Sequence, residues 1–273
     1  MVISFRTVRL NRNGTQQPFL SGDKMLHMAT LLAPHIMLPE NSSAHIEILL
    51  RWIHFLAGIT WVGLLYFFNL VNIPFMKELD ASLKPKVVPN LMPKALWWFR
   101  WSSVVTVVAG IWYWMIIIGA NRRAAEAAGE HANSGPLIGS FFGIWTVVAI
   151  VMVGIFMMGK LNNSIPALAV IFTVLIVGAS WLFLSVNSNG WETSRVLSIG
   201  IGGGFGWVMM MNVWGIIWRA QKKLIGWTSA GQTPPEMAKW SRMALVASRT
   251  NFVLSFPMLF FMAAASHYPM FGK

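Results

Sequence analysis

The sequence predicts an all-α protein: a polytopic membrane helical bundle of about six transmembrane helices, with both termini on the outer (periplasmic) side. Hydrophobic residues make up 56% of the 273-residue chain and charged residues only 11%, against roughly 25% charged residues in a soluble domain. Six stretches lack Asp, Glu, Lys and Arg over the length of about 20 residues that a bilayer-crossing helix requires. Tryptophans gather near the ends of these stretches, as aromatic side chains do at the headgroup layer.

The six uncharged stretches follow one another and cover most of the chain. Their apolar residues surround each helix, as contact with lipid or burial in a bundle requires. The stretches are residues 52–76, 101–121, 132–159, 161–191, 196–218 and 250–272. Because proline suits a first helical turn, the fourth helix is expected to begin near Pro166, after a very short loop at Lys160. The Pro-containing segment 77–94 and the charged segment 222–242 are expected to be solvated connections.

The distribution of basic residues predicts the orientation. The chain carries a net charge of +12, and most of its Lys and Arg residues outside the N-terminal tail lie in the connections after the first, third and fifth stretches. The connections after the second and fourth stretches carry only Arg122, Arg123 and Arg195. Under the positive-inside rule, the first group of connections faces the cytoplasm and both termini face outward. The basic surplus therefore reports membrane topology, and no nucleic-acid partner is expected.

Two regions are predicted: a polar or amphipathic tail over residues 1–44 and a transmembrane helical domain over residues 45–273. The tail contains four basic residues that oppose its export, namely Arg6, Arg9, Arg12 and Lys24. Two interpretations stay open. Translation could begin at Met25, which would remove all four, or the segment 24–37 could be a degenerate signal segment or a surface helix.

Two histidines stand out because ionisable side chains inside a bilayer are costly and mark functional sites. His54 lies one turn into the first stretch, and His267 lies at the far end of the sixth. With an even number of spans, both imidazoles are expected at a similar shallow depth on the outer side. Neutral imidazole binds iron well, and an apolar helical bundle supplies a low-dielectric pocket. The pair is therefore predicted to ligate the iron of a haem b.

Arg51 adjoins this layer and is predicted to neutralise a haem propionate. A structural interpretation remains open for each of the three residues, because an interfacial histidine can simply snorkel and an arginine can anchor a helix end. His45, at the entrance of the first helix, is an alternative ligand on the same side. His27, His35 and His131 fall in the tail or a loop and receive no assignment.

The other small and polar residues of the stretches are assigned to packing. The glycine-rich segment 200–206 is expected to let a neighbouring helix approach closely. Asn69, Asn72, Asn212 and Asn251 are expected to join helices, with a substrate or quinone contact as the other interpretation. No stretch contains an interior Asp or Glu, which argues against a proton pump. The absence of cysteine excludes disulfides, iron–sulfur clusters and covalently attached haem.

Four segments resemble, in order, the urate oxidase N-terminal domain, a membrane domain that precedes a C-terminal cytochrome c in a membrane-bound urate-oxidising enzyme. They are 50–63 (LRWIHFLAGITWVG), 93–101 (PKALWWFRW), 212–223 (NVW to QKK) and 248–269 (SRTN, PMLF and HYP). The resemblance covers roughly residues 45–270 and singles out the same His54 and His267. It also implies an outer C-terminus. In the first loop the family carries a glycine-rich segment with a histidine, whereas residues 84–92 here contain none.

The resemblance implies an integral membrane electron-transfer subunit that binds haem b in the bacterial inner (cytoplasmic) membrane. The chain ends at Lys273 and has no cysteine, so a separate cytochrome c, or other respiratory subunits, is the expected partner besides the lipid bilayer. We accordingly expect the membrane subunit of an oxidoreductase and not a complete urate-oxidising enzyme. Two other classes stay open: a non-redox membrane scaffold of a larger complex, and a small-molecule (purine) transporter.

Overall fold

A computed structural model describes residue 22 and residues 42–271. By its contacts the chain divides into residues 1–42 and residues 43–273, and the helices below belong to the second of these units. The expectations about a start at Met25 and about the segment 24–37 lie outside the described residues. Within the described residues the secondary structure is entirely helical, which confirms the predicted fold class.

Six continuous helical spans are long and apolar enough to cross a membrane, as predicted: Ser42–Glu78, Lys84–Ala127, Ser134–Met158, Ile165–Val186, Ser194–Ser229 and Met237–His267. The first consists of α2 (Ser42–Tyr66), a π-helical segment η1 (Phe67–Asn72) and α3 (Ile73–Glu78). The second, third and fourth are α4, α5 and α6. The fifth consists of α7 (Ser194–Asn212), η2 (Val213–Ile217) and α8 (Trp218–Ser229), and the sixth is α9.

The expected solvated connections at 77–94 and 222–242 are wrong in extent. Helix α4 begins at Lys84 and continues through Pro89 and Pro93, while Pro85 occupies its first turn, where the missing N–H has no intrahelical partner to lose. Burial of apolar residues such as Met92 stabilises this helix despite the hydrogen bonds that the two internal prolines cannot make. The second connection shortens in the same way to residues 230–236.

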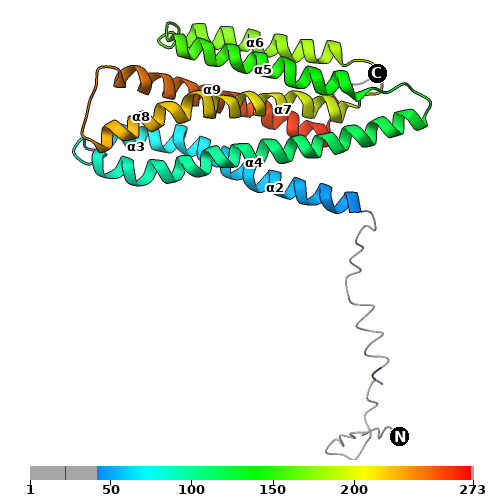
Figure 1. Ribbon diagram of the computed structural model, residues 1–273, viewed down its shortest axis with the longest axis horizontal. Coiled ribbons are helices and arrows are strands. Elements are labelled where there is room, and N and C mark those ends of the chain that lie inside the picture. The colour runs from blue at the N-terminus through cyan, green and yellow to red at the C-terminus, as the bar shows by residue number, and fades with distance from the viewer. Residues whose placement is uncertain (1–21, 23–41, 272–273) are drawn as a thin grey trace, which may run out of the picture. The chain divides into compact units, whose positions relative to one another are not determined.

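Helix α7 is the central helix of the bundle, between α9, α5 and α4. In Figure 1, α5 and α6 lie on one side of α7 and α9, and α2 and α4 lie on the other. Three glycines of α7 contact large side chains of neighbouring helices: a Cβ at Gly200 would lie 2.5 Å from Phe183 Cζ, and one at Gly204 would lie 2.0 Å from Trp145 Cε2. At Gly202 it would lie 3.0 Å from Phe261 Cβ. The predicted packing role of segment 200–206 is confirmed.

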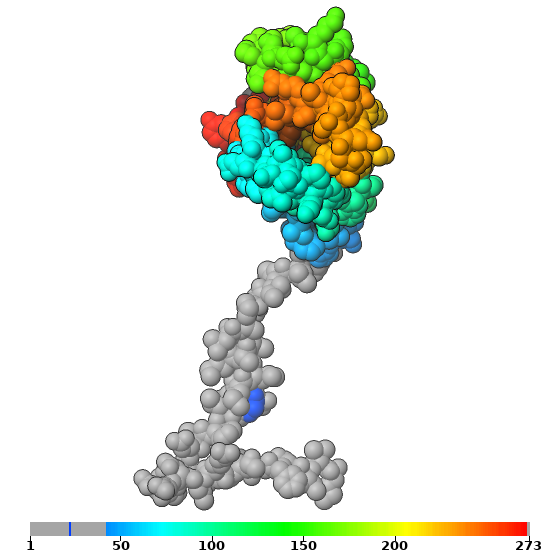
Figure 2. All heavy atoms as spheres, turned by 90° about the vertical axis from the view of Figure 1, so that its left-hand side faces the viewer, coloured from blue at the N-terminus to red at the C-terminus, as the bar shows by residue number. Residues whose placement is uncertain are grey.

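The six spans alternate in direction, so α2 begins and α9 ends at the same end of the bundle (Figure 1). We call this the histidine end, because His54 and His267 both lie near it. The connections 79–83 and 230–236 lie at the opposite end, which faces the viewer in Figure 2. We call it the connection end. The side of the membrane that each end faces remains a prediction from the basic residues.

Candidate cofactor site

The His54 side chain reaches from α2 to the backbone of α4. Its Nδ1 lies 2.8 Å from the carbonyl oxygen of Thr106. Because a carbonyl oxygen can only accept a hydrogen bond, Nδ1 carries the proton and donates it. The neutral ring then has its free lone pair on Nε2, which bonds to no described residue. One nitrogen is thus fixed by the protein and the other is available to a ligand.

Gly110 provides the space in which the His54 ring lies. A Cβ placed on Gly110 would be 2.8 Å from both Cε1 and Nδ1 of His54, a separation that real Cβ atoms essentially never show. The residue lies one helical turn after Thr106, so the absent side chain exposes the backbone at the point where Nδ1 donates. The glycine therefore permits both the position of the ring and its hydrogen bond.

Two arginines converge on one phenol, one helical turn closer to the histidine end. Nη2 of Arg51 and Nη2 of Arg195 each donate to the hydroxyl oxygen of Tyr113, at 2.5 Å in both cases. The guanidinium carbons lie 5.1 and 5.9 Å from the centre of the Tyr113 ring. Arg51 precedes His54 by three residues on α2, and Tyr113 follows Gly110 by three residues on α4. Residues three apart share a helix face, so the two contacts form adjacent layers between α2 and α4.

The charge of this arginine pair has no carboxylate partner among the residues that the structure describes. Glu192 is the acidic residue nearest to Arg195 in sequence, but its carboxylate accepts hydrogen bonds from the backbone and side-chain amides of Asn189, at 3.0 Å each. Nε of Arg195 is buried and makes no hydrogen bond. Two partly buried guanidinium groups without a carboxylate partner among the described residues favour the binding of an anion, and paired arginines suit carboxylate geometry.

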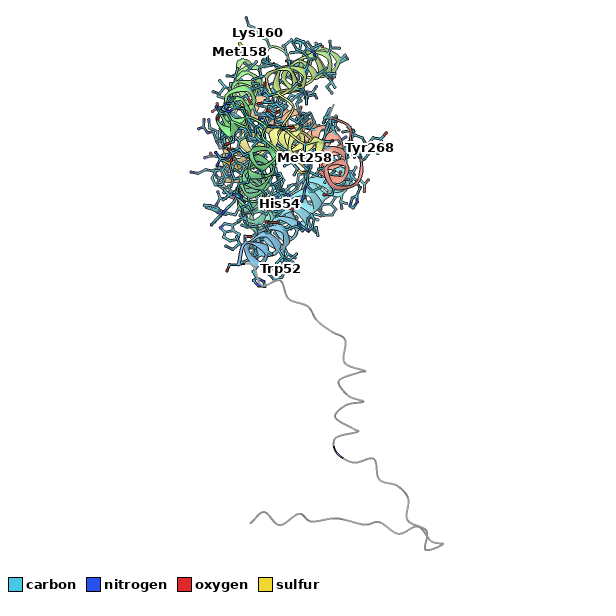
Figure 3. The ribbon with its side chains drawn as sticks, turned by 90° about the vertical axis from the view of Figure 1, so that its right-hand side faces the viewer. Trp52, His54, Met158, Lys160, Met258 and Tyr268 are labelled. Carbon is cyan, nitrogen blue, oxygen red and sulfur yellow. The ribbon has the colours of Figure 1, made fainter. Side chains whose placement is uncertain are left out.

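The other predicted site residue, His267, lies in the last turn of α9 and is exposed. Within the described residues, no hydrogen bond or ring contact joins it to His54. The segment after it is held to the start of α7, where the Ser194 hydroxyl accepts hydrogen bonds from the backbone of Met270 and Phe271. Figure 3 looks onto the histidine end and labels His54 on α2 and Tyr268 just after α9.

The other two histidines that the structure describes add no further ligand to the layer. His45 is exposed in the first turn of α2, and His131 is exposed in the loop after α4, while His27 and His35 lie outside the described residues. Across residues 42–271 no three His, Cys, Asp or Glu side chains are close enough to hold a metal ion together. A site that depends on three such protein ligands is therefore absent from the described residues.

Sequence reasoning identified His54 and Arg51 but missed the residues of α4 and α7 that complete the layer. Nothing in the sequence marks Thr106 or Gly110 as part of a site, and Arg195 was used only to predict the orientation in the membrane. Tyr113 had one available signal. It is one of three tyrosines in a chain with 18 phenylalanines, and a hydroxyl within an apolar helix is expected to have a hydrogen-bond partner.

The six helices and this layer define a multi-pass α-helical membrane protein with a candidate histidine–arginine site formed by its first, second and fifth spans. The chain belongs to the urate oxidase N-terminal family, whose model matches residues 79–273. No curated protein and no solved structure matches the chain. The matched range contains Tyr113, Arg195 and His267, whereas His54 and Arg51 precede it. Three of the four resembling segments accordingly lie within the match, and segment 50–63 lies before it.

Proposed function

We propose that this protein is the membrane-embedded electron-transfer subunit of an oxidoreductase, that it binds haem b at His54, and that it passes electrons to a separate cytochrome c. The observation that carries the proposal is the hydrogen bond from His54 Nδ1 to the Thr106 carbonyl. Metal-ligating histidines almost always donate their other ring N–H to a carbonyl, a carboxylate or water. This bond holds the ring orientation and leaves Nε2 as the ligating atom.

The residues around His54 fit the other demands of a haem. Arg51 and Arg195 supply two guanidinium groups without a carboxylate partner, and the propionates of haem b are carboxylates that would pair with them. The surrounding helices are apolar, which lowers the local dielectric and lets the protein tune the reduction potential. Haem, when bound, supplies the one-electron chemistry that the proposed electron transfer requires.

We propose His267 as the second axial ligand of the haem iron. It lies at the histidine end, as His54 does, but it is exposed and makes no contact with His54. Ligation by both would require the end of α9 to approach α2. The alternative is that His54 and a ligand other than His267 hold the haem iron. Replacement of His267 would then leave haem binding intact.

The partner follows from the family and from the composition. The family is described as urate oxidase N-terminal, and covalent attachment of a c-type haem requires cysteines that this chain lacks. Residues 1–273 therefore hold no c-type haem, and we propose that a separate cytochrome c carries it and that residues 1–273 do not oxidise urate alone. The basic connections favour a bacterial inner-membrane orientation with the histidine end facing the periplasm, where the cytochrome c would dock.

Haem content tests the proposal. The full-length protein is purified from membranes of a haem-replete host, and haem b is measured by the pyridine haemochrome assay in wild type, His54→Ala and His131→Ala. We expect haem b in the wild type and in His131→Ala, whose histidine is an exposed loop residue, and its loss from His54→Ala. A wild type without haem, or a His54→Ala variant with full haem content, would overturn the proposal.

A further inference from the structure

A second site lies at the connection end, apart from the histidine–arginine layer. An open cavity of about 360 Å³ is lined by η1 and α3, the first half of α4, the η2–α8 segment and α9. Figure 2 looks onto this end, where the surface is hollowed between the segments around α3 and those of α8 and α9. Small-molecule sites typically have volumes of about 300–1,000 Å³ and a mostly apolar lining with a few polar groups. The cavity meets both criteria.

Both π-helical segments of the bundle border this cavity. Phe68 and Asn72 of η1 and Ile217 of η2 are among its lining residues. A π-helical turn inserts an extra residue into a helix and weakens its regular hydrogen bonding, and such segments occur frequently at functional sites. Two of them on the walls of one cavity are a second indication of a binding site.

Asn72 points to the chemistry of the ligand. Its side chain is 9% exposed, and its Oδ1 accepts no hydrogen bond from any described residue. An acceptor buried without a partner costs about 1–3 kcal/mol. Asn72 lines the cavity, and a small rotation of its amide would bring this oxygen to an O–H or N–H of a ligand, whose hydrogen bond would recover that free energy.

The rest of the lining restricts the ligand further. Phe68 and Phe99 meet edge to face with their ring centres 5.3 Å apart, and Met76 and Met92 add adaptable apolar surface. Among the described residues that line the cavity, Lys84 is the one charged side chain, so a ligand with a positive charge is disfavoured. These walls suit a flat ring with an apolar body and no positive charge.

We propose that this cavity binds the headgroup of a lipophilic quinol, with one ring hydroxyl donating to Oδ1 of Asn72. A quinol combines a flat ring, hydroxyl donors and an apolar tail, and it dissolves in the bilayer that the helices cross. The choice of a quinol over other hydroxyl-bearing ring compounds rests on the proposed electron-transfer function, which needs a membrane-soluble redox partner. The binding site itself rests on the cavity and on Asn72.

Direct binding of a labelled probe tests the site. The full-length protein in phosphatidylcholine nanodiscs is titrated with tritiated 2-decylhydroquinone, and the dimethyl ether of the same compound serves as a probe without donors. We expect saturable binding above that of empty nanodiscs, and at least fivefold weaker binding of the ether. Asn72→Leu should weaken hydroquinone binding about tenfold, the effect of one lost hydrogen bond in a buried site.

Asn90→Leu is the matched control, because Asn90 is an exposed amide of α4 that bonds to Lys86 within its own helix and does not line the cavity. If Asn72→Leu does not fold, Leu245→Trp, which fills the cavity from α9, takes its place and should abolish binding. Binding no greater than in empty nanodiscs, equal binding of the ether, or unchanged affinity in the tested cavity variant would overturn the quinol site.

The two proposals fail separately. Loss of probe binding in a protein that retains haem overturns the quinol site alone, whereas saturable probe binding in a protein without haem overturns the haem proposal alone.

Discussion

Two contacts in the bundle share one design, an aromatic ring lying against a helix glycine. Trp145 lies over Gly204 of the central helix α7, and His54 lies over Gly110 of α4. Trp145 is fully buried, whereas His54 is half-buried on α2 and donates a hydrogen bond to Thr106. In the apolar part of the span that contains α7, 78% of the residues are buried. In the corresponding part of the span that contains α2, only 17% are buried.

The difference separates packing from function. Trp145 completes an interior that is closed on all sides, so Gly204 is required for stability. The imidazole of His54 lies where the bundle is open, with one nitrogen held by the backbone and the other free. A polar ring at a thinly packed helix contributes little to stability, so we expect Gly110 to affect the candidate site more than the stability of the fold.

The largest effect is expected on stability from Gly204→Ala. The new Cβ would lie 2.0 Å from Cε2 of the enclosed Trp145, and overpacking of this kind typically costs about 1–3 kcal/mol. We expect the upper part of that range, measured as the thermal unfolding of the protein in detergent. Gly203→Ala is the control, because its Cβ would lie an ordinary 3.6 Å from Phe141. Equal melting of the two variants would refute the packing role.

A smaller effect on stability but a large one on haem content is expected from Gly110→Ala. The added methyl would push the half-buried His54 ring away from α4 and break its hydrogen bond to Thr106. The buried core would stay in place. We predict at least a tenfold loss of haem affinity with nearly unchanged melting. Gly63→Ala, with no atom within 4 Å of its new Cβ, should leave both unchanged. Haem content equal to that of wild type would remove Gly110 from the site.

A more modest effect is expected from Arg51→Gln and Arg195→Gln. Each removes one of the two guanidinium groups at Tyr113 and leaves the His54 contact intact. Haem affinity should fall about tenfold or less, because a hydrogen bond to a charged group contributes about 1.5–3 kcal/mol and the other arginine remains. Arg122→Gln, which loses an exposed pair with Glu126, is the control in the same haem titration. Undiminished affinity in both arginine variants would exclude propionate binding by this pair.

The smallest expected effect is on stability at acidic pH. It comes from Asp80, which lies in the connection 79–83 and belongs to neither the Trp145–Gly204 nor the His54–Gly110 contact. The backbone N–H of Ser82 donates to its carboxylate at 2.8 Å, and this bond, followed by the Ser82 hydroxyl, lowers the pKa of Asp80. A lowered pKa in the folded state means that the contribution to stability is present above the unfolded pKa and is lost as the pH falls through the folded pKa.

The group is fully exposed, so the change should be small and confined to acidic pH. A carboxyl carbon NMR titration of Asp80 should show the lowered pKa, and Ser82→Pro, which removes the donating N–H, should raise it. An unchanged pKa in that variant would assign the shift to another cause.

The number and order of the spans could be predicted from the sequence, because each is built around a charge-free stretch of the chain. The helical part of segment 77–94 could not, because three prolines there signal a connection and only tertiary packing of residues such as Met92 stabilises the helix. At the candidate site, His54 and Arg51 could be predicted from the sequence, because polar side chains are energetically costly inside a bilayer. Tyr113 and Arg195 lie 62 and 144 positions from Arg51 in sequence, and only the fold brings them together. The cavity beside Asn72 has the same origin.

Chemical rescue of the proposed iron ligand tests the central claim most directly. His54→Gly removes the imidazole and leaves a space against Gly110 that free imidazole can fill. The reduced-minus-oxidised absorption spectrum of the haem-reconstituted variant should lack the wild-type haem b bands and regain them on addition of imidazole. A variant that keeps the wild-type spectrum without imidazole, or that fails to regain it with imidazole, would contradict ligation by His54.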